Sequence, residues 1–233
     1  MQKQTTEQSL YKKREKIYTK VIRGSSQNYR VLVAALVYGA FFLIPWINYG
    51  DRPLVYFDLD ARQFHIFALN FWPQDFMYLA WLLIIAAFSL FLFTTVAGRL
   101  WCGFACPQTM WTLAFMWIEQ KIEGKPHMRK HLDAEPMSFR KFRIKLAKHA
   151  IWLIMAILTG MTFVAYFYPI REMIVDISTL SVPLTGLFWI GVFTYLTYLD
   201  AGWLREQVCI YMCPYARFQS VMYDKNTLLV AYN

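Results

Sequence analysis

The chain of 233 residues is 58% hydrophobic and 18% aromatic, only 17% of its residues are charged, and its mean hydropathy is positive. Soluble domains carry about 25% charged and 45–50% apolar residues, so this composition excludes an ordinary soluble protein and predicts an integral membrane protein. The net charge of +9 does not indicate nucleic-acid binding, because the basic residues cluster between hydrophobic runs, as in the cytoplasmic loops of membrane proteins.

The first half of the chain predicts a membrane hairpin. Residues 1–28 form a basic arm without the apolar core of a signal peptide, and we expect either a topogenic tail or an amphipathic helix on anionic lipid. Residues 31–47 are uncharged and just long enough to span a bilayer, and residues 76–97 form a second span. Between them, the segment LVYFDLDARQFHIF predicts a short hairpin or an interfacial element.

The second half predicts another hairpin behind a basic loop. Residues 108–122 indicate a helix along or just beneath the membrane surface, and residues 150–168 and 184–199 are the third and fourth spans. His127 and His131 have the i, i+4 spacing of metal ligands, but Pro126 and the surrounding charges favour a solvated loop. The predicted fold is all-α, with four transmembrane helices arranged as two helix-hairpin repeats.

The distribution of positive charge predicts the orientation. The N-terminal arm has seven basic residues and the 119–149 loop has nine, whereas the two opposite loops have three between them. Because basic loops stay in the cytoplasm, both ends of the chain are expected there. The expected segments are the arm (1–28), the first hairpin repeat (29–118), the basic loop (119–149), the second repeat (150–216) and the start of a cytoplasmic segment (217–233).

All four cysteines lie in two C-x3-C-P motifs, Cys102 with Cys106 and Cys209 with Cys213, each placed after a long apolar run. This is the spacing of the last two cysteines in bacterial ferredoxin runs. On a helix, residues i and i+4 share a face, so each pair could present two thiolates, and two pairs could form one four-thiolate site. The prolines are suited to the first turn of the following helix.

The chemistry of four cytoplasmic thiols narrows the choice of ligand. A disulfide is disfavoured in a reducing compartment, and unreactive buried cysteines do not account for two matching motifs. Zinc sites more often use C-x2-C spacing with histidine. Copper(I) and an iron–sulfur cluster remain, and spacing does not separate them. Met110, Met116 and Met212 are weaker candidates as copper(I) ligands. Arg99, Arg205 and Arg217 either balance the negative charge of the thiolates or serve only topology, and the topological role is favoured.

The segments GRLWCGFACPQTMWT and REQVCIYMCPYARFQSVMYDKNTLLVAYN resemble the membrane part of the CcoG/FixG/RdxA family, and the resemblance covers nearly the whole chain. A wider similarity links C-x3-C-P after a helix pair to NapH- and NosR-type membrane ferredoxin-like proteins. The family resemblance implies a bacterial inner-membrane protein that assists assembly of cbb-type cytochrome c oxidase, with iron–sulfur and cupric reductase properties.

The resemblance implies that Cys102, Cys106, Cys209 and Cys213 ligate an iron–sulfur cluster, copper(I) or both, and it assigns no catalytic residue. The expected function is reduction of copper(II) to copper(I) for the oxidase, so the expected partners are the oxidase and its copper-delivery proteins. Two alternatives stay open: a non-enzymatic copper(I) chaperone or scaffold, and a quinol-linked electron-transfer subunit. A homodimer is also left open.

Overall fold

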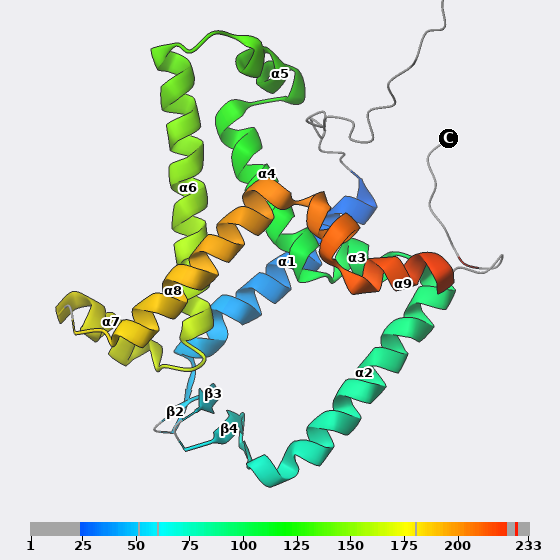
Figure 1. Ribbon diagram of the computed structural model, residues 1–233, viewed down its shortest axis with the longest axis vertical. Helices are drawn as coiled ribbons and strands as arrows, with labels where there is room; N and C mark the ends of the chain where they lie inside the picture. The colour runs from blue at the N-terminus through cyan, green and yellow to red at the C-terminus, as the bar shows by residue number, and fades with distance from the viewer. Residues whose placement is uncertain (1–23, 51, 60, 180, 223–226, 228–233) are drawn as a thin grey trace, which may run out of the picture.

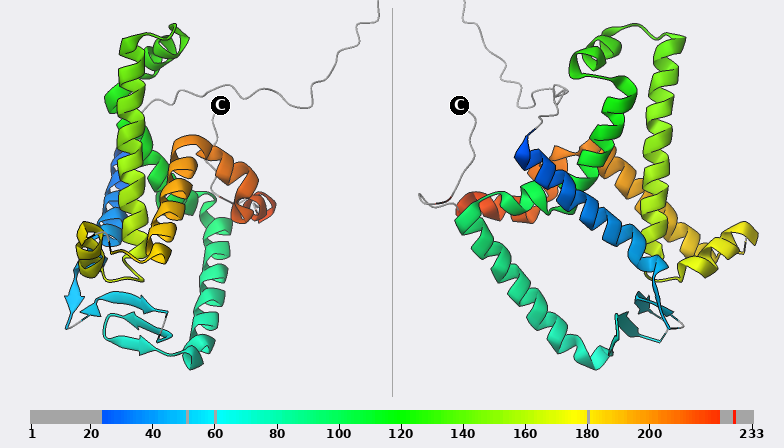
Figure 2. Two further views of the ribbon diagram at one scale, coloured as in Figure 1. Left: turned by 60° about the vertical axis from the view of Figure 1, so that its left-hand side comes forward. Right: turned by 180° about the vertical axis from the view of Figure 1, so that it is seen from behind.

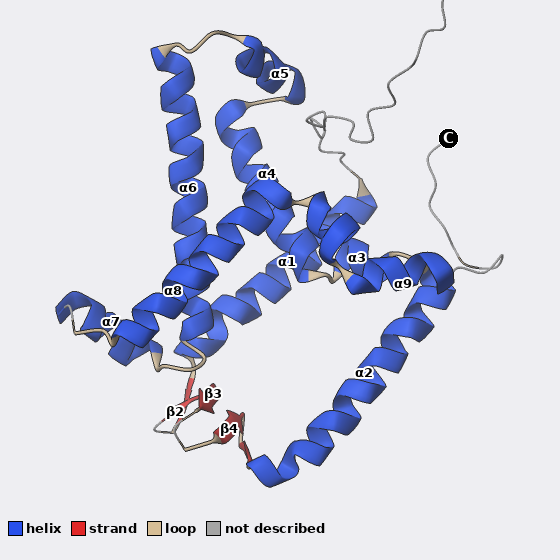
Figure 3. Cartoon of the chain, in the orientation of Figure 1, coloured by secondary structure: helices blue, strands red, loops and turns tan. Residues whose placement is uncertain are grey.

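The computed structural model describes residues 24–50, 52–59, 61–179, 181–222 and 227, and most of these residues are helical (Figures 1 and 3). The predicted basic arm lies almost wholly outside the described residues, as does most of the predicted 217–233 segment. The first long helix, α1 (Ser25–Leu43), begins inside the predicted arm and continues into the 3-10 turn η1 (Ile44–Trp46).

The connection between the first two long helices contains the predicted hairpin. Its described residues form five short strands, β1 (Asn48–Tyr49), β2 (Arg52–Pro53), β3 (Val55–Asp58), β4 (Gln63–Ile66) and β5 (Leu69–Phe71). Strands β1 and β2 pair antiparallel, and β3, β4 and β5 form a second antiparallel sheet in sequence order, with Tyr56 opposite His65. The turn η2 (Pro73–Asp75) then leads into α2 (Phe76–Ala97), whose bounds match the predicted second span.

The predicted basic loop is largely helical, so the expectation of a loop at His127 and His131 is wrong, although both side chains are exposed as expected. After α3 (Leu100–Phe104), helix α4 (Pro107–Glu123) is followed by α5 (Pro126–Ala134) and α6 (Phe139–Val164). His127 and His131 lie in α5, where Pro126 occupies the first helical position and therefore interrupts no hydrogen bond. The predicted surface helix is α4, and its side chains Phe115 and Ile118 are buried against α6 and η3.

The remaining elements are α7 (Ile170–Thr179), α8 (Leu184–Thr197), the π-helical segments η3 (Tyr198–Leu204) and η4 (Val208–Met212), and α9 (Pro214–Met222). By length and composition, α1 with η1, α2 with η2, and α6 could each cross a membrane. A fourth span requires the pair formed by α7 and the 184–204 helix, which are bent by 105° relative to one another. Three candidate spans are therefore present among the described residues, and the fourth stays a prediction.

The two predicted hairpins pack differently. Helices α6 and α8 are in extensive contact, whereas α2 diverges from α1 and meets the rest of the fold at its two ends (Figures 1 and 2). One end of α2 joins the strands, and the other lies beside α3 and α9. Helix α2 is apolar on all sides, which is typical of a helix surrounded by lipid. The cysteine motifs therefore gather where α2, α3 and α9 meet.

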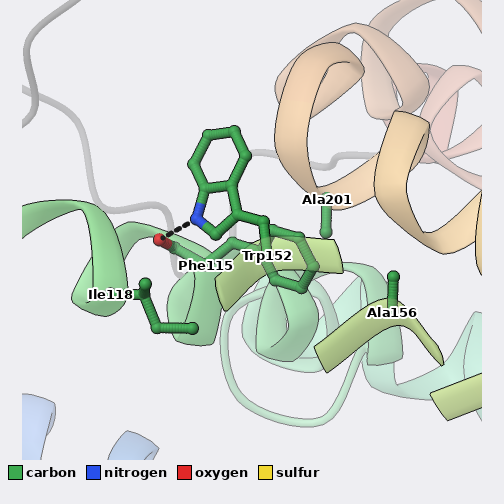
Figure 4. Close-up of a cluster of buried hydrophobic side chains, with 5 residues drawn as sticks. All are labelled: Phe115, Ile118, Trp152, Ala156 and Ala201. Carbon is green, nitrogen blue, oxygen red and sulfur yellow. Dashed lines mark hydrogen bonds between the residues drawn. The ribbon is translucent and has the colours of Figure 1, made fainter. Parts of the chain in front are cut away.

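The first hydrophobic core lies close to the second motif. Phe115 and Ile118 from α4 pack against Trp152 and Ala156 from α6 and against Ala201 from η3 (Figure 4). The indole nitrogen of Trp152 donates a hydrogen bond to the Phe115 carbonyl at 3.2 Å, so the one polar atom of this large side chain has a partner. This core fixes η3, and hence the segment leading to Cys209, against the helix that follows Cys106.

The second core lies at the other end of α6. Val164 and Ala165 pack with Ile170 and Met173 of α7 and with Ile190 of α8. These contacts orient α8, whose C-terminal continuation leads to the second cysteine motif.

Candidate functional site

The first motif is placed by a turn, a short helix and a proline. Gly98 ends α2 with φ 55° and ψ −115°, a conformation that glycine adopts without a Cβ clash. Cys102 then lies inside α3, which ends before Cys106. Cys106 is extended (φ −66°, ψ 125°), as expected for the residue before a proline, and Pro107 begins α4. The Thr109 hydroxyl of α4 donates to the Cys102 carbonyl at 2.7 Å, and this hydrogen bond connects α4 to α3.

The second motif repeats this local structure. Cys209 lies in η4, and Cys213 is extended (φ −77°, ψ 112°) before Pro214, which begins α9. Each pair therefore straddles the end of a helical segment, so the expectation that both cysteines of a pair share one helix face is wrong. The proline is the reason, because it disfavours helical geometry in the cysteine that precedes it.

The turns before the two motifs also match. Gly98 stands four residues before Cys102, and Arg205 stands four residues before Cys209. Arg205 has φ 45° and ψ −113°, nearly the conformation of Gly98, although it carries a side chain. The structural register of the repeat thus pairs Gly98 with Arg205.

Hydrogen bonds bring the two motifs together. The Cys102 Sγ contacts Oε1 of Gln219 in α9 at 3.9 Å, and the Gln219 amide nitrogen donates to the Gly98 carbonyl at 3.0 Å. The hydroxyl of Tyr215, also in α9, bonds Thr94 of α2. On the other side, the Gln108 amide of α4 donates to the Arg205 carbonyl at 3.2 Å. Segments about a hundred residues apart therefore meet at one site.

The four thiols are free, partly exposed and close enough to influence one another. Burial, followed by the charges of Cys106, Cys213 and Cys209, raises the pKa of Cys102, although its bond to Gln219 acts in the opposite direction. Burial and then the charges of Cys106 and Cys213 raise the pKa of Cys209. Thiolates here repel each other, so a bound cation is needed to hold several of them deprotonated together.

The donor set fits an iron–sulfur cluster in its chemistry. Among the residues that the structure describes, no three histidine, cysteine or acidic side chains converge closely enough to hold one metal ion. A single tetrahedral ion would need sulfur atoms within about 4 Å of each other, given metal–sulfur distances of about 2.3 Å. A cluster places several iron and sulfide atoms between its thiolates and thus tolerates wider spacing. Four neighbouring thiols fit this group in chemistry.

The weaker methionine candidates occupy different surroundings. Met110, one turn into α4 after Cys106, is only 2% exposed and is part of the protein interior. Met212 directly precedes Cys213 and is 67% exposed. Met116 is on α4, beyond Met110. A thioether at the surface beside a thiol is therefore available at Met212 and not at Met110.

A buried ionic cluster next to the site was missed in the sequence. Glu119 of α4 is 1% exposed and pairs with Arg205 at 2.8 Å and with Arg129 of α5 at 3.3 Å. Lys148 of α6 lies 2.8 Å from Glu123. Glu119 and Glu123 share the i, i+4 face of α4 with buried apolar residues, which is the signal that could have indicated burial. Arg205 is thus an ion-pair partner, and a purely topological role for it is wrong.

The charge state of this cluster follows from its cations. Burial by itself raises the pKa of Glu123, but the Lys148 and Lys145 ammonium groups outweigh burial and hold that pKa below its usual range. Lys145 lies 2.9 Å from Glu123 and 2.6 Å from Asp133. The ion pairs of the cluster therefore tie α4, α5, α6 and the turn before Cys209 together.

Comparison with known proteins assigns a cofactor class to both motifs. Residues 79–126, which contain Cys102 and Cys106, match a family model described as a 4Fe-4S binding domain. Residues 204–233, which contain Cys209 and Cys213, match a 4Fe-4S dicluster domain. Together with the helices that could cross a membrane, these matches define a membrane iron–sulfur protein. No solved structure matches the chain.

Three relatives cover nearly the whole chain. Nitrogen fixation protein FixG of Rhizobium meliloti is 42% identical over 230 residues, covering 96% of this chain and 44% of the relative. Proteins RdxB and RdxA of Cereibacter sphaeroides are each 36% identical, over 98% and 96% of this chain and 49% of each relative. The chain belongs to the FixG/RdxA family, as its motifs predicted. It spans about half the length of the curated relatives that it matches.

Proposed function

We propose that this protein transfers electrons at a membrane through one iron–sulfur cluster ligated by Cys102, Cys106, Cys209 and Cys213. The observation that carries the proposal is the contact between the two motifs. Gln219, on the helix after the second motif, meets the Cys102 Sγ, and Gln108, on the helix after the first motif, donates to the Arg205 carbonyl before the second. Matches to 4Fe-4S domains over both motifs support it. When bound, the cluster supplies one-electron oxidation and reduction.

The chain's own groups have distinct roles in this proposal. The four thiolates hold the cluster, and the prolines fix Cys106 and Cys213 in extended geometry ahead of α4 and α9. The N-terminal ends of these helices carry partial positive charge, which favours thiolates beside them. Partial burial of the thiols limits access of water to the site.

We further propose that electrons leaving this site reduce copper(II) to copper(I) for the copper site of a cbb-type oxidase in the bacterial inner membrane. Each copper ion would gain one electron, which a reduced cluster held by the four thiolates would supply. The family resemblance supports this, as does the exposed thioether of Met212 beside Cys213, because copper(I) prefers thiolate and thioether ligands. The oxidase and its copper-delivery proteins would then be the partners.

The same exposed Met212 favours a second function, in which the protein binds copper(I) and hands it on without redox turnover. Metal analysis separates the two functions. The full chain is purified anaerobically in detergent, iron, acid-labile sulfide and copper are measured, and EPR spectra are recorded before and after dithionite. Iron with sulfide and a reducible signal supports the cluster, and copper without iron supports the chaperone.

Single substitutions test whether the four thiols form one site. Cys102→Ser, Cys209→Ser and Cys213→Ser should each abolish the same signal. Retention of half the iron in each variant would show two separate sites.

Copper reduction is tested with the same purified protein. The dithionite-reduced protein, freed of excess dithionite, is mixed with copper(II), and copper(I) is detected with a chromogenic chelator. We expect Met212→Leu to slow copper(I) formation without loss of iron, and Met137→Leu is the matched control because Met137 is highly exposed and far along the chain from both motifs. A protein that retains its cluster but produces no copper(I) would contradict the copper proposal.

We propose that the motifs face the cytoplasm, as the distribution of basic residues predicts. In apo protein, a membrane-impermeant maleimide should label the four thiols in inside-out vesicles and not in right-side-out vesicles. Labelling from the opposite side would reverse the orientation.

A further inference from the structure

Two glutamine side chains link the cysteine motifs in opposite directions. Gln108 lies on α4, the helix that follows the first motif, and donates to the carbonyl of the turn before the second motif. Gln219 lies on α9, the helix that follows the second motif, and donates to the carbonyl of the turn before the first motif. The carbonyls that accept these bonds belong to Arg205 and Gly98, the two residues whose backbone conformations match.

The positions of the glutamines are also related. Gln108 is two residues after Cys106, and Gln219 is six residues after Cys213. A difference of four residues is about one helical turn, so both glutamines lie on the equivalent face of their helices. Each of the two hydrogen bonds thus joins the helix that follows one motif to the turn that precedes the other motif. The sequence pattern alone did not single out either glutamine.

The geometry points to Gln108 and Gln219 as reciprocal positioning residues that hold the two C-x3-C-P motifs at the spacing of a single four-thiol site. This inference rests on the proposed function, in which the four thiols share one cluster. Neither side chain is assigned a ligand role.

Burial explains why these bonds can fix the spacing. Gln219 is 2% exposed, so its amide has little access to water, and a turn carbonyl left without its donor there would be costly. The same amide contacts Cys102 Sγ through its oxygen, which places the thiol relative to the Gly98 turn. Gln108 is partly buried and does the same for the turn that leads to Cys209.

Cross-linking measures the spacing without any cluster. Cys102 and Cys213 are replaced by serine, which leaves one thiol in each motif, Cys106 and Cys209. The apo protein in detergent reacts with dibromobimane, which becomes fluorescent when it bridges two thiols. Monobromobimane, which needs only one thiol, reports accessibility separately.

Each glutamine is then replaced in this background in two ways. The leucine variants, Gln108→Leu and Gln219→Leu, remove the amide donor. The glutamate variants, Gln108→Glu and Gln219→Glu, keep the size of the side chain but place a carboxylate against the turn carbonyl that accepted the hydrogen bond. We expect each variant to bridge about tenfold more slowly, the order of effect of losing one hydrogen bond that holds a buried group. Monobromobimane rates should not change. Gln120→Leu is the control, because Gln120 lies on α4 but makes neither link.

Two results would overturn the inference: bridging rates in all four glutamine variants equal to that of Gln120→Leu, or equal losses in bridging and in single-thiol labelling. If a leucine variant loses helical circular dichroism, the isosteric glutamate variant decides the matter. In the four-cysteine protein, the variants should also change the EPR line shape of the cluster. A parent protein without iron would contradict the proposed function, while the bridging rates would still test the positioning.

Discussion

Replacing Gly160 with alanine should separate α6 from α8. A Cβ atom at Gly160 would lie 2.7 Å from the Thr194 hydroxyl, 2.9 Å from the Ile190 carbonyl oxygen and 3.1 Å from the Thr194 backbone nitrogen. Because two of these atoms belong to the backbone of α8, a side-chain rotation cannot relieve the contact. Close helix approach at a small residue is a common way for membrane helices to associate.

Gly191 on α8 provides the matched control. A Cβ atom there meets no atom within 4 Å, so Gly191→Ala brings only the helix-favouring effect of alanine, about 0.5–1 kcal/mol. Overpacking at Gly160 costs about 1–3 kcal/mol, and comparison of the two alanine variants cancels the propensity effect. A difference of about 2 kcal/mol corresponds to a melting temperature about 4–8 °C lower for Gly160→Ala.

The measurement is thermal unfolding of both variants in one detergent, followed by tryptophan fluorescence and by loss of the monodisperse peak in size-exclusion chromatography. Equal melting temperatures for the two variants would refute the close approach of α6 and α8 at Gly160. The Cys209 segment should also become more reactive in Gly160→Ala, because α8 leads into η3 and η4.

Three further outcomes are expected in the same unfolding assay. Arg205→Gly should destabilise the fold by about 2 kcal/mol, because loss of an ion-pair partner of the buried Glu119 outweighs the relief of strain at positive φ. Arg62→Gly is the control, because Arg62 also has positive φ but is exposed, and this variant should not be destabilised. Equal effects of the two substitutions would contradict the ion pair. Lys148 and Lys145 hold the pKa of Glu123 below its ordinary value of 4.5, so the ionised carboxylate stabilises the fold above that pH. This stabilisation is lost as the pH falls through the lower folded pKa, so Glu123→Gln should flatten the dependence of melting temperature on pH in the acid range below pH 4.5. Trp152→Ala should cost about 3–5 kcal/mol, and a loss below about 1 kcal/mol would show that the first core does not support the fold.

Local rules made parts of this protein predictable. The uncharged run at 76–97 defined α2 to the residue, because a helix that is apolar on all sides carries its signal in composition. The prolines after Cys106 and Cys213 predicted helix starts, which the structure confirms at α4 and α9. The alternation around residues 54–67 predicted a hairpin, and β3 and β4 confirm it.

Other elements depended on partners far away in the chain. Helix α6 begins at Phe139 and not near residue 150, because its charged first turns are paired with carboxylates of α4 and α5. The charge run that indicated a solvated loop is therefore partly buried. A window of sequence cannot distinguish a basic residue in water from one paired with a distant carboxylate.

At the candidate site, the four cysteines, their two motifs and the family could be predicted from the amino-acid pattern. The match of Arg205 with Gly98, and the links that Gln108 and Gln219 make between the motifs, became visible in the folded chain. The physical reason is that these links join a side chain to a backbone carbonyl more than ninety residues away. Every residue carries the same backbone carbonyl, so neither the spacing nor the composition of the sequence can indicate which carbonyl a glutamine will reach.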